Sequence, residues 1–311
     1  MTAFVLRRLL WTIPVLLLVI LFTFLLMRQI EGNPFRRSER AVPTQVQENL
    51  ERKFRLDDPW YVQYAYYVKG VFTLDLGPSL VLRNRSVNDI VAEHFPRSIE
   101  LGLLALLFAI VVGVPLGVLS ALRANTSVDY AAMFAANVGF AVPSFLVATL
   151  LIYFFALEWR DLFGLPTSGW STWRHKILPS IALGLGPMAY FARLVRGSML
   201  ETLQQDYIRT ARAKGLRWRR VVLVHALRNS LIPAVTAAGP LLGFLITGSF
   251  VIELIFAIPG IGRYYVTAVS ARDYSVVMGL TVLLSGIVIL ANLVVDILYG
   301  VLDPRTREAR T

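Results

Sequence analysis

The sequence predicts an all-α integral membrane protein, and its composition is the first indication. Of the 311 residues, 56% are hydrophobic and only 16% are charged, whereas in soluble domains about a quarter of the residues are charged. The hydrophobic residues form long runs without any charge, and the basic residues collect in alternate segments between these runs. Together, these observations favour six membrane-spanning helices over one large soluble core.

Six runs approach the length that a bilayer requires, because about 20 helical residues span a hydrocarbon core of about 30 Å. In chain order they are residues 9–27, 101–122, 130–157, 177–192, 230–252 and 274–295. The first follows Arg7 and Arg8 but is too long for a signal peptide and lacks a small-residue cleavage site, so we predict a retained span. The fourth is short and contains Gly184, Gly186 and Pro187, so we expect it to be broken.

The charges between the spans predict the orientation. Residues 193–228 contain nine Arg and Lys residues but only two acidic residues, Glu201 and Asp206. Because cytoplasmic loops are enriched in Lys and Arg, we expect this segment and both termini to be cytoplasmic. The net charge of +11 also raises the question of a nucleic-acid partner, but this enrichment accounts for the basic loop without one. We therefore expect no nucleic acid.

Residues 31–97 are too long for a simple turn and should form a cap on the outward side. Residues 44–54 carry apolar residues at helical spacing, and residues 60–69 form a second candidate helix rich in tyrosine. The tyrosines fit a belt at the membrane interface. Stacking on a sugar or a peptide is the alternative for these side chains, namely Tyr61, Tyr64, Tyr66 and Tyr67.

No catalytic or metal site is predicted. His94, His175 and His225 are expected in or beside loops, and no pair has the spacing of a zinc-binding helix. Ser144 and Ser285 lack the setting of a hydrolase nucleophile. The chain has no cysteine and no phosphate-binding loop of the ATPase type. We therefore expect a protein that is not an enzyme and has no cofactor of its own.

The basic cytoplasmic segment contains the most informative local pattern. Asp206 is a suitable N-cap for a helix over residues 207–214. Gly215 supplies the left-handed residue that ends such a helix, and Leu216 is placed to close over Ala211 in a Schellman arrangement. A second short helix is expected over residues 217–229.

Two short helices joined by a glycine and standing off the membrane would fit a groove on a soluble partner. The small side chains of Thr210, Ala211 and Ala213 would allow a close approach. The alternative is an amphipathic helix that lies on anionic lipid. The residues alone leave both interpretations open.

At this segment the sequence resembles a known family. DYIRTARAKGL (residues 206–216) and HALRNSLIP (residues 225–233) resemble the cytoplasmic coupling loop of ABC importer permeases, specifically the B-type subunit of the dipeptide and oligopeptide family. The broader superfamily carries Glu-Ala-Ala, then three further residues, then a glycine. That pattern falls on Arg209, Thr210, Ala211 and Gly215, where only Ala211 and Gly215 match. The departures are typical of the peptide branch.

The resemblance runs nearly from end to end. It includes PRSIELGLLAL (96–106), VPLGVLSALR (114–123), AVPSF (141–145), LDLGPSL (74–80), FAIPGIGRYYVTAVSARDY (256–274) and DILYGVLDPRTR (296–307). It implies the six-helix fold of type I ABC importers. The expected organisation is a first span in residues 1–30, an extracytoplasmic cap in 31–97, a permease core in 98–302 with the coupling loop at 197–229, and a cytoplasmic tail in 303–311.

The resemblance also implies the function and the partners. The chain would be a permease subunit in the cell membrane, paired with a second homologous permease in a heterodimer and surrounded by lipid. Two ATPase subunits would bind ATP and Mg, and an extracytoplasmic binding protein would deliver the solute. The family's members import peptides, nickel chelates or oligosaccharides. The residues implied in coupling to the ATPase are Asp206, Arg209, Thr210, Ala211, Ala213, Gly215 and Leu216.

An ion-coupled secondary transporter is the main alternative function. Such a carrier would bury ionisable groups near the middle of the membrane, but Glu100 and Asp296 lie near span ends, where a salt bridge or a cap explains them. Glu253 is the candidate for contact with a charged substrate, and packing against residues 256–274 is its alternative role. A scaffold or receptor would leave the coupling loop without a purpose.

Overall fold

The computed structural model describes residues 2–29, 58–82 and 84–302, and these are mostly helical, without a β-strand in the described ranges. The chain divides into two compact units. The first unit comprises Met1–Ser98 and Pro259–Leu290, and the second comprises Ile99–Ile258 and Ala291–Thr311. The all-α prediction is confirmed.

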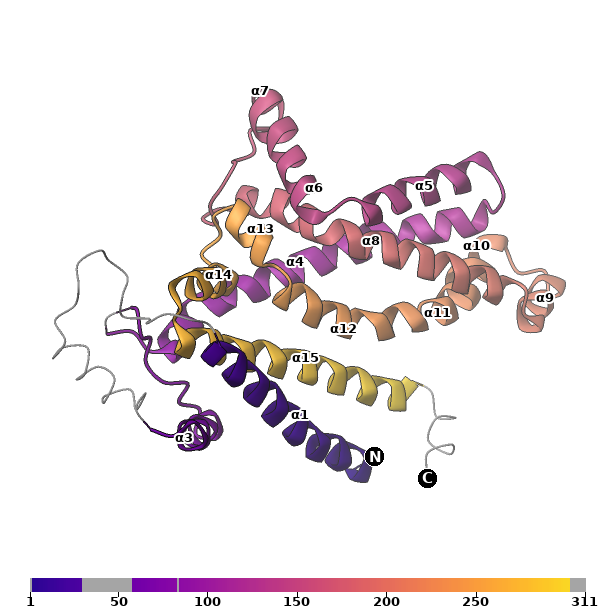
Figure 1. The fold of residues 1–311 in the computed structure, drawn as a ribbon. Helices are drawn as coiled ribbons and strands as arrows, with labels where there is room; N and C mark the ends of the chain where they lie inside the picture. Colours follow the sequence, from indigo (N-terminus) through magenta and orange to yellow (C-terminus); the bar gives the residue numbers. More distant parts are fainter. Residues whose placement is uncertain (1, 30–57, 83, 303–311) are drawn as a thin grey trace. The chain divides into compact units, whose positions relative to one another are not determined.

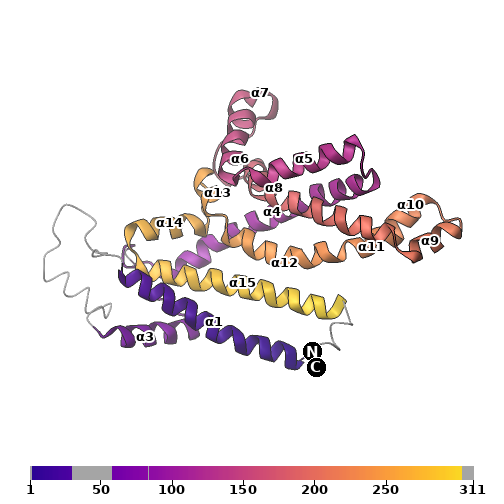
Figure 2. The same ribbon diagram turned by 45° about the vertical axis from the view of Figure 1, so that its right-hand side comes forward.

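The first unit is built on α1 (Thr2–Gln29), which confirms the first predicted span. α1 packs beside the first half of α15 (Tyr274–Leu302) in both views (Figures 1 and 2). α14 (Ile261–Ala271) adds Ile261 and Ala268 to the same core. The core side chains that α1 and α15 share are Ile20, Phe24, Met27, Val276, Val277 and Leu280.

The predicted tyrosine-rich helix is present as α3 (Trp60–Phe72). The Tyr64 hydroxyl donates a 3.0 Å hydrogen bond to the Leu17 carbonyl of α1, and Tyr67 packs against the core of the first unit. Tyr61 and Tyr66 remain exposed, so the tyrosines divide between packing and surface. The helix predicted over residues 44–54 lies outside the described residues.

α4 (Val87–Leu122) begins well before the predicted start of the second span at residue 101. Ser86 caps it, because the Asp89 amide donates to the Ser86 hydroxyl at 3.1 Å and the Ser86 amide donates to the Asp89 carboxylate at 3.0 Å. The charged residues before residue 101 interrupt the apolar run but not the helix. His94 therefore lies inside a helix, and its predicted place in or beside a loop is wrong.

The third predicted span, residues 130–157, is not one straight helix. α5 (Ser127–Ala141) and α6 (Ser144–Leu151), which continues into the π-helical η1 (Ile152–Glu158), meet at a bend of 104°. The residue before a proline is driven to an extended backbone, and Val142 before Pro143 has φ −78° and ψ 126°. The prediction of an unbroken span is wrong for this reason.

The prediction for the fourth span is wrong in the opposite sense. The sequence predicts a break, but α8 (Trp173–Leu203) is a continuous helix of 31 residues. It is the helix against which α5, α6 and α12 pack in the second unit. The expected break does not occur because these neighbours support the helix through Pro179 and Pro187. α12 (Ile232–Thr247) and α13 (Phe250–Ile255) cover the fifth predicted span.

Glycines bring α4 and α8 into backbone contact. A methyl group at Gly113 or Gly117 would collide with the carbonyl oxygens of Met188 and Ala192. Small residues spaced by four are a common device for close helix crossing in membranes. Gly113 and Gly117 therefore allow the close approach of α4 and α8.

Four helices are long and apolar enough to cross a membrane, and two bent pairs bring the number to six if each pair is one span. The four are α1, α4, α8 and α15. The bent pairs are α5 with α6–η1, and the helical stretch Trp218–Ser230 with α12, which bends by 45°. The described residues therefore match the six predicted spans in number only if each bent pair crosses the membrane as one span.

Candidate functional site

The predicted coupling loop is a helical hairpin at the C-terminal end of α8 (Figure 1). Its first helix is α9 (Asp206–Ala213). Its second is a continuous helical run made of α10 (Trp218–Arg220), the π-helical η2 (Val221–Ala226) and α11 (Leu227–Ser230). We refer to residues 206–230 as the coupling hairpin.

The turn of the hairpin has the predicted geometry. Gly215 has φ +74°, in the left-handed region where a side chain is strained. The Leu216 amide donates to the Ala211 carbonyl at 3.4 Å, and the Gly215 amide donates to the Arg212 carbonyl at 2.9 Å. These two bonds define a Schellman motif, so the predicted end of α9 is confirmed.

The predicted start of α9 is wrong by one residue. Gln205, not Asp206, is the N-cap, with an extended backbone (φ −68°, ψ 149°) and no side-chain capping bond. Asp206 instead lies in the first turn, where a negative charge is favourable beside the free amides of the helix start. Its carboxylate is 3.4 Å from the Arg209 guanidinium.

The inner face of α9 holds the hairpin together. Ile208 and Ala211 are buried against the second helix, at Val221, Val222 and Ala226. The same core includes Ala121 of α4 and Met199 of α8. The hairpin is therefore joined to two membrane-spanning helices of its own unit by apolar packing.

Two polar contacts close the sides of the hairpin. The Asn229 amide donates a 2.8 Å hydrogen bond to the Tyr207 hydroxyl. The Arg212 guanidinium lies 4.1 Å from the centre of the Trp218 ring, within the range of a cation–π contact. Each contact links α9 to the second helix, so the hairpin is braced along its length.

The outer face of α9 is exposed and contains most of the predicted site residues. Positions three, four and seven apart lie on one side of a helix, and the exposed residues with this spacing are Asp206, Arg209, Thr210 and Ala213. Ala211 differs from them because it is buried in the hairpin. α9 also has no free apolar face, because its own hairpin covers Ile208, and a lipid-bound helix requires such a face.

A buried ion pair connects the spans that support the hairpin, and the sequence analysis missed it. Asp129 of α5 is 1% exposed and accepts two 2.7 Å hydrogen bonds from the guanidinium of Arg196 on α8. Ser120, near the end of α4, donates a third bond, and the Asn125 amide donates a fourth at 2.9 Å. Arg196 had been assigned only to the basic loop, and its partner is 67 residues away, so no local pattern reveals the pair.

The remaining predicted acidic residues have structural surroundings. Glu100 pairs with Lys176 and accepts a 2.8 Å hydrogen bond from Trp170, which favours the salt bridge over the cap among its two expected roles. Glu253 is fully buried and accepts a 2.6 Å bond from Ser249. This geometry supports the packing role of Glu253, and its contact with a solute stays a prediction.

Comparison with protein families identifies the architecture. Residues 113–308 match the model described as binding-protein-dependent transport system inner membrane component, and residues 1–102 match the corresponding N-terminal model. The chain belongs to this family. As an inner membrane component, it is a multi-pass membrane protein and the permease subunit of an ATP-driven ABC importer that works with separate ATPase and binding-protein partners.

Curated relatives of this permease subunit match along almost their whole length. The dipeptide transport system permease protein DppB of Bacillus subtilis is 49% identical over 96% of both chains. The oligopeptide transport system permease protein OppB of Haemophilus influenzae is 44% identical, and that of Escherichia coli is 45% identical, over 99% of this chain and 100% of theirs. The ion-coupled alternative finds no support among these relatives.

Solved structures confirm the fold of the permease subunit. Two inward-facing structures of the MetNI methionine ABC transporter superpose with TM-scores of 0.56 and 0.53 at 20% sequence identity. They cover 69% and 67% of this chain and 96% and 95% of theirs. The similarity shows that the helical core has the same fold as the compared chains of this transporter. The permease itself is a transport subunit, and ATP is hydrolysed elsewhere.

Proposed function

We propose that this chain forms part of the translocation path of a peptide importer, in a heterodimer with a second homologous permease embedded in lipid. The observation that carries the proposal is the identity of 44–49% with peptide permeases over almost the full length. Uptake of labelled dipeptides and longer peptides by cells that carry the whole system tests it. A system that imports only nickel chelates or oligosaccharides would contradict the peptide assignment.

We further propose that the outer face of α9 docks into a groove of an ATPase subunit. The ATPase subunits, and not this chain, bind ATP and Mg. Three features support this role: the small side chains of Thr210 and Ala213, their exposure, and the bracing of the hairpin behind them. When ATP closes the ATPase subunits, the hairpin moves with the groove. Its packing on Met199 and Ala121 passes the motion to α8 and α4. Access then switches between two arrangements of the helices.

The coupling role is tested by changing the outer face without changing the inner one. Ala213→Glu places a charge at an exposed position, so the hairpin should fold, but an unpaired charge in the docked interface should lower uptake by at least about tenfold. Ala213→Ser is the matched control and should transport normally. Normal uptake and normal ATPase attachment in the Ala213→Glu variant would show that this face is not the docking surface.

Gly215→Val tests the turn. A β-branched residue at φ +74° is strained by about 1 kcal/mol or more, so α9 should be misdirected while the spans still insert. ATP hydrolysis by the assembled complex should no longer become faster when the loaded binding protein is added. Ala211→Glu is a poorer test, because Ala211 is buried and the charge would disrupt the hairpin itself.

We also propose that both termini and the coupling hairpin face the cytoplasm, and that residues 31–97 face outward. Nine basic residues in 193–228 support this orientation. Because the chain has no cysteine, an Arg212→Cys variant offers a single thiol. An impermeant reagent should label it only in opened cells, and labelling in intact cells would reverse the topology.

A further inference from the structure

The first unit contains a cavity of about 290 Å³ that none of the roles above uses. Two regions far apart in the sequence form its walls: Val81 and Leu82 with His94 of α4 in one, and α14 with the start of α15 in the other. Most of the surface is apolar. The remaining lining residues are Pro259, Arg263, Tyr264, Thr267, Ala268, Ala271, Asp273 and Val276.

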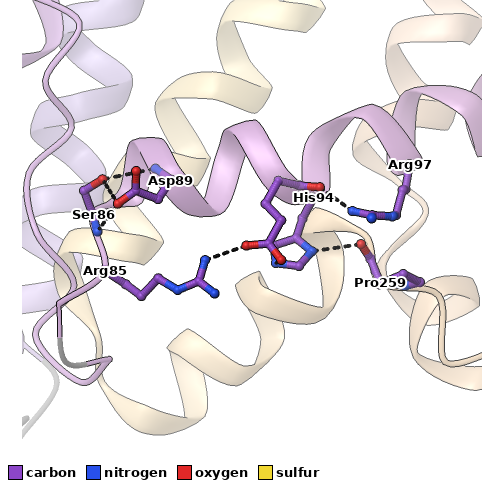
Figure 3. Close-up of polar contacts among 7 residues, drawn as sticks. Arg85, Ser86, Asp89, His94, Arg97 and Pro259 are labelled. Carbon is purple, nitrogen blue, oxygen red and sulfur yellow. Dashed lines mark hydrogen bonds and ion pairs between the residues drawn. The ribbon is translucent and has the colours of Figure 1, made fainter.

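Two buried polar residues line this cavity: His94, with 6% of its surface exposed, and Asp273. Nδ1 of His94 lies 3.0 Å from the Pro259 carbonyl oxygen (Figure 3). A carbonyl only accepts, so Nδ1 carries the proton and donates it. In the neutral ring Nε2 is then an acceptor, and this atom has no hydrogen-bond partner among the described residues. The wall of the cavity thus contains this acceptor in an apolar surrounding.

The neighbouring acid does not satisfy this acceptor. Glu93 lies 3.8 Å from Nε2, beyond hydrogen-bond distance. Its carboxylate is paired with Arg85 (Figure 3). The hydrogen bond to Glu93 raises the pKa of the Arg85 guanidinium, which keeps this pair charged. Among the residues that the structure describes, Nε2 of His94 is therefore a buried acceptor without a hydrogen-bond partner in the wall of the cavity, and a donor reaches it only when the ring or its neighbours shift.

The other charged residues of the cavity indicate which charge the ligand carries beside its donor group. Arg263 lines the cavity, is exposed, and makes no ion pair within the described part of the chain. Asp273 is buried and already accepts bonds from Ser79 and from the Leu80, Val81 and Val276 amides, so its charge is not free. A ligand for this site has an apolar body, one donor at its tip and a negative charge nearby.

We propose that the cavity receives a tyrosine or tryptophan side chain, flanked by an acidic residue, of the extracytoplasmic binding protein. Such side chains combine an apolar ring with one O–H or N–H donor and commonly anchor protein interfaces. The volume is at the small end of pockets that hold whole ligands, which favours one inserted side chain over a peptide. This inference rests on the proposed outward orientation of residues 31–97, which include the cavity residues Val81, Leu82 and His94.

Thiol protection tests the occupant directly. Thr267 lines the cavity and Ser270 does not, yet both are exposed on α14 and both hydroxyls bond to the carbonyl four residues earlier. In the reconstituted complex, the loaded binding protein should slow labelling of a Thr267→Cys variant by at least about tenfold, and that of Ser270→Cys by much less. Equal labelling with and without the binding protein overturns the proposal. Protection by free peptide alone also overturns it and makes the cavity a solute site.

A second measurement uses hydrolysis stimulated by the binding protein. His94→Asn keeps a donor near the Nδ1 position but removes the acceptor at Nε2, so the half-maximal concentration of the loaded binding protein should rise about two- to tenfold. Ala271→Trp fills the cavity and should raise it by more than about tenfold. Ser270→Trp is the control on the same helix.

Basal hydrolysis and the maximal stimulated rate should stay unchanged in all these variants. Wild-type behaviour of the Ala271→Trp variant overturns the proposal for the cavity. A wild-type complex that no binding protein stimulates would instead contradict the proposed function, so the two failures are distinguishable.

Discussion

Asp129 and Asp273 are both almost fully buried, one in each compact unit, but their charges are balanced in different ways. Asp129 is 1% exposed and faces the guanidinium of Arg196 through two 2.7 Å bonds. Asp273 is 2% exposed, and among the described residues its donors are neutral: the Ser79 hydroxyl and the amides of Leu80, Val81 and Val276.

The difference reflects what each aspartate holds. The ion pair joins α5 to α8, with α4 attached through Ser120, so it fixes the spans on which the coupling hairpin is mounted. Asp273 accepts hydrogen bonds from the amides of a short irregular segment and thereby shapes one wall of the cavity at His94. Asp129 should therefore matter for the stability of the whole second unit, and Asp273 for local order.

Asp129→Asn should have the largest effect on stability. It keeps the shape of the side chain but leaves Arg196, whose side chain is 28% exposed, without its counter-charge. Each of the two charged hydrogen bonds that are lost contributes about 1.5 kcal/mol or more. The midpoint of thermal unfolding of the purified complex should fall clearly. Asp161→Asn, at an exposed position of α7 (Arg160–Phe163), is the control. A midpoint unchanged by Asp129→Asn would refute the role of the pair.

Asp273→Asn should have a smaller and more local effect. The amide presents one oxygen and one donor to a group of donors, so about 2 kcal/mol of hydrogen bonding is lost. Hydrogen exchange of the Leu80 and Val81 amides should become faster, while the second unit keeps its protection. A global destabilisation equal to that of Asp129→Asn would erase the distinction between the two aspartates.

Ser120 and Ser79 each donate a hydrogen bond to one of the two aspartates, and replacing them should give the smallest changes in stability. Ser120→Ala removes one of four donors to Asp129 and should cost about 1 kcal/mol or less. Ser79→Ala should cost more, because the Ser79 hydroxyl also accepts from the Leu82 amide at 2.8 Å and the Val81 amide at 3.2 Å. Thermal midpoints of the two variants, measured side by side, give the order. The reverse order would mean that the segment at 79–82 is held by other contacts.

Local patterns in the sequence predicted the spans and the hairpin turn well. Uncharged runs define most of the spans because lipid excludes charge over the whole hydrocarbon depth. Gly215 marks the end of α9 because a left-handed backbone is required there. The bend at Pro143 also had a local signal, since the preceding Val142 is restricted to an extended backbone.

Other features depend on contacts that no local pattern contains. α8 stays whole through Pro179 and Pro187 because α5, α6 and α12 pack around it. The Asp129–Arg196 pair and the cavity at His94 join residues that are far apart in the chain. Ala211 matched the family pattern, yet only the structure shows that it faces inward.

A cross-link tests most directly whether the outer face of α9 touches an ATPase subunit. In the cysteine-free chain, an Ala213→Cys variant provides one thiol on that face, and a Ser168→Cys variant provides one in the exposed loop before α8. A short thiol-to-amine reagent should join the Ala213→Cys chain, and not the Ser168→Cys chain, to an ATPase subunit of the assembled complex. An ATPase cross-link from position 168 and none from position 213 would contradict the account.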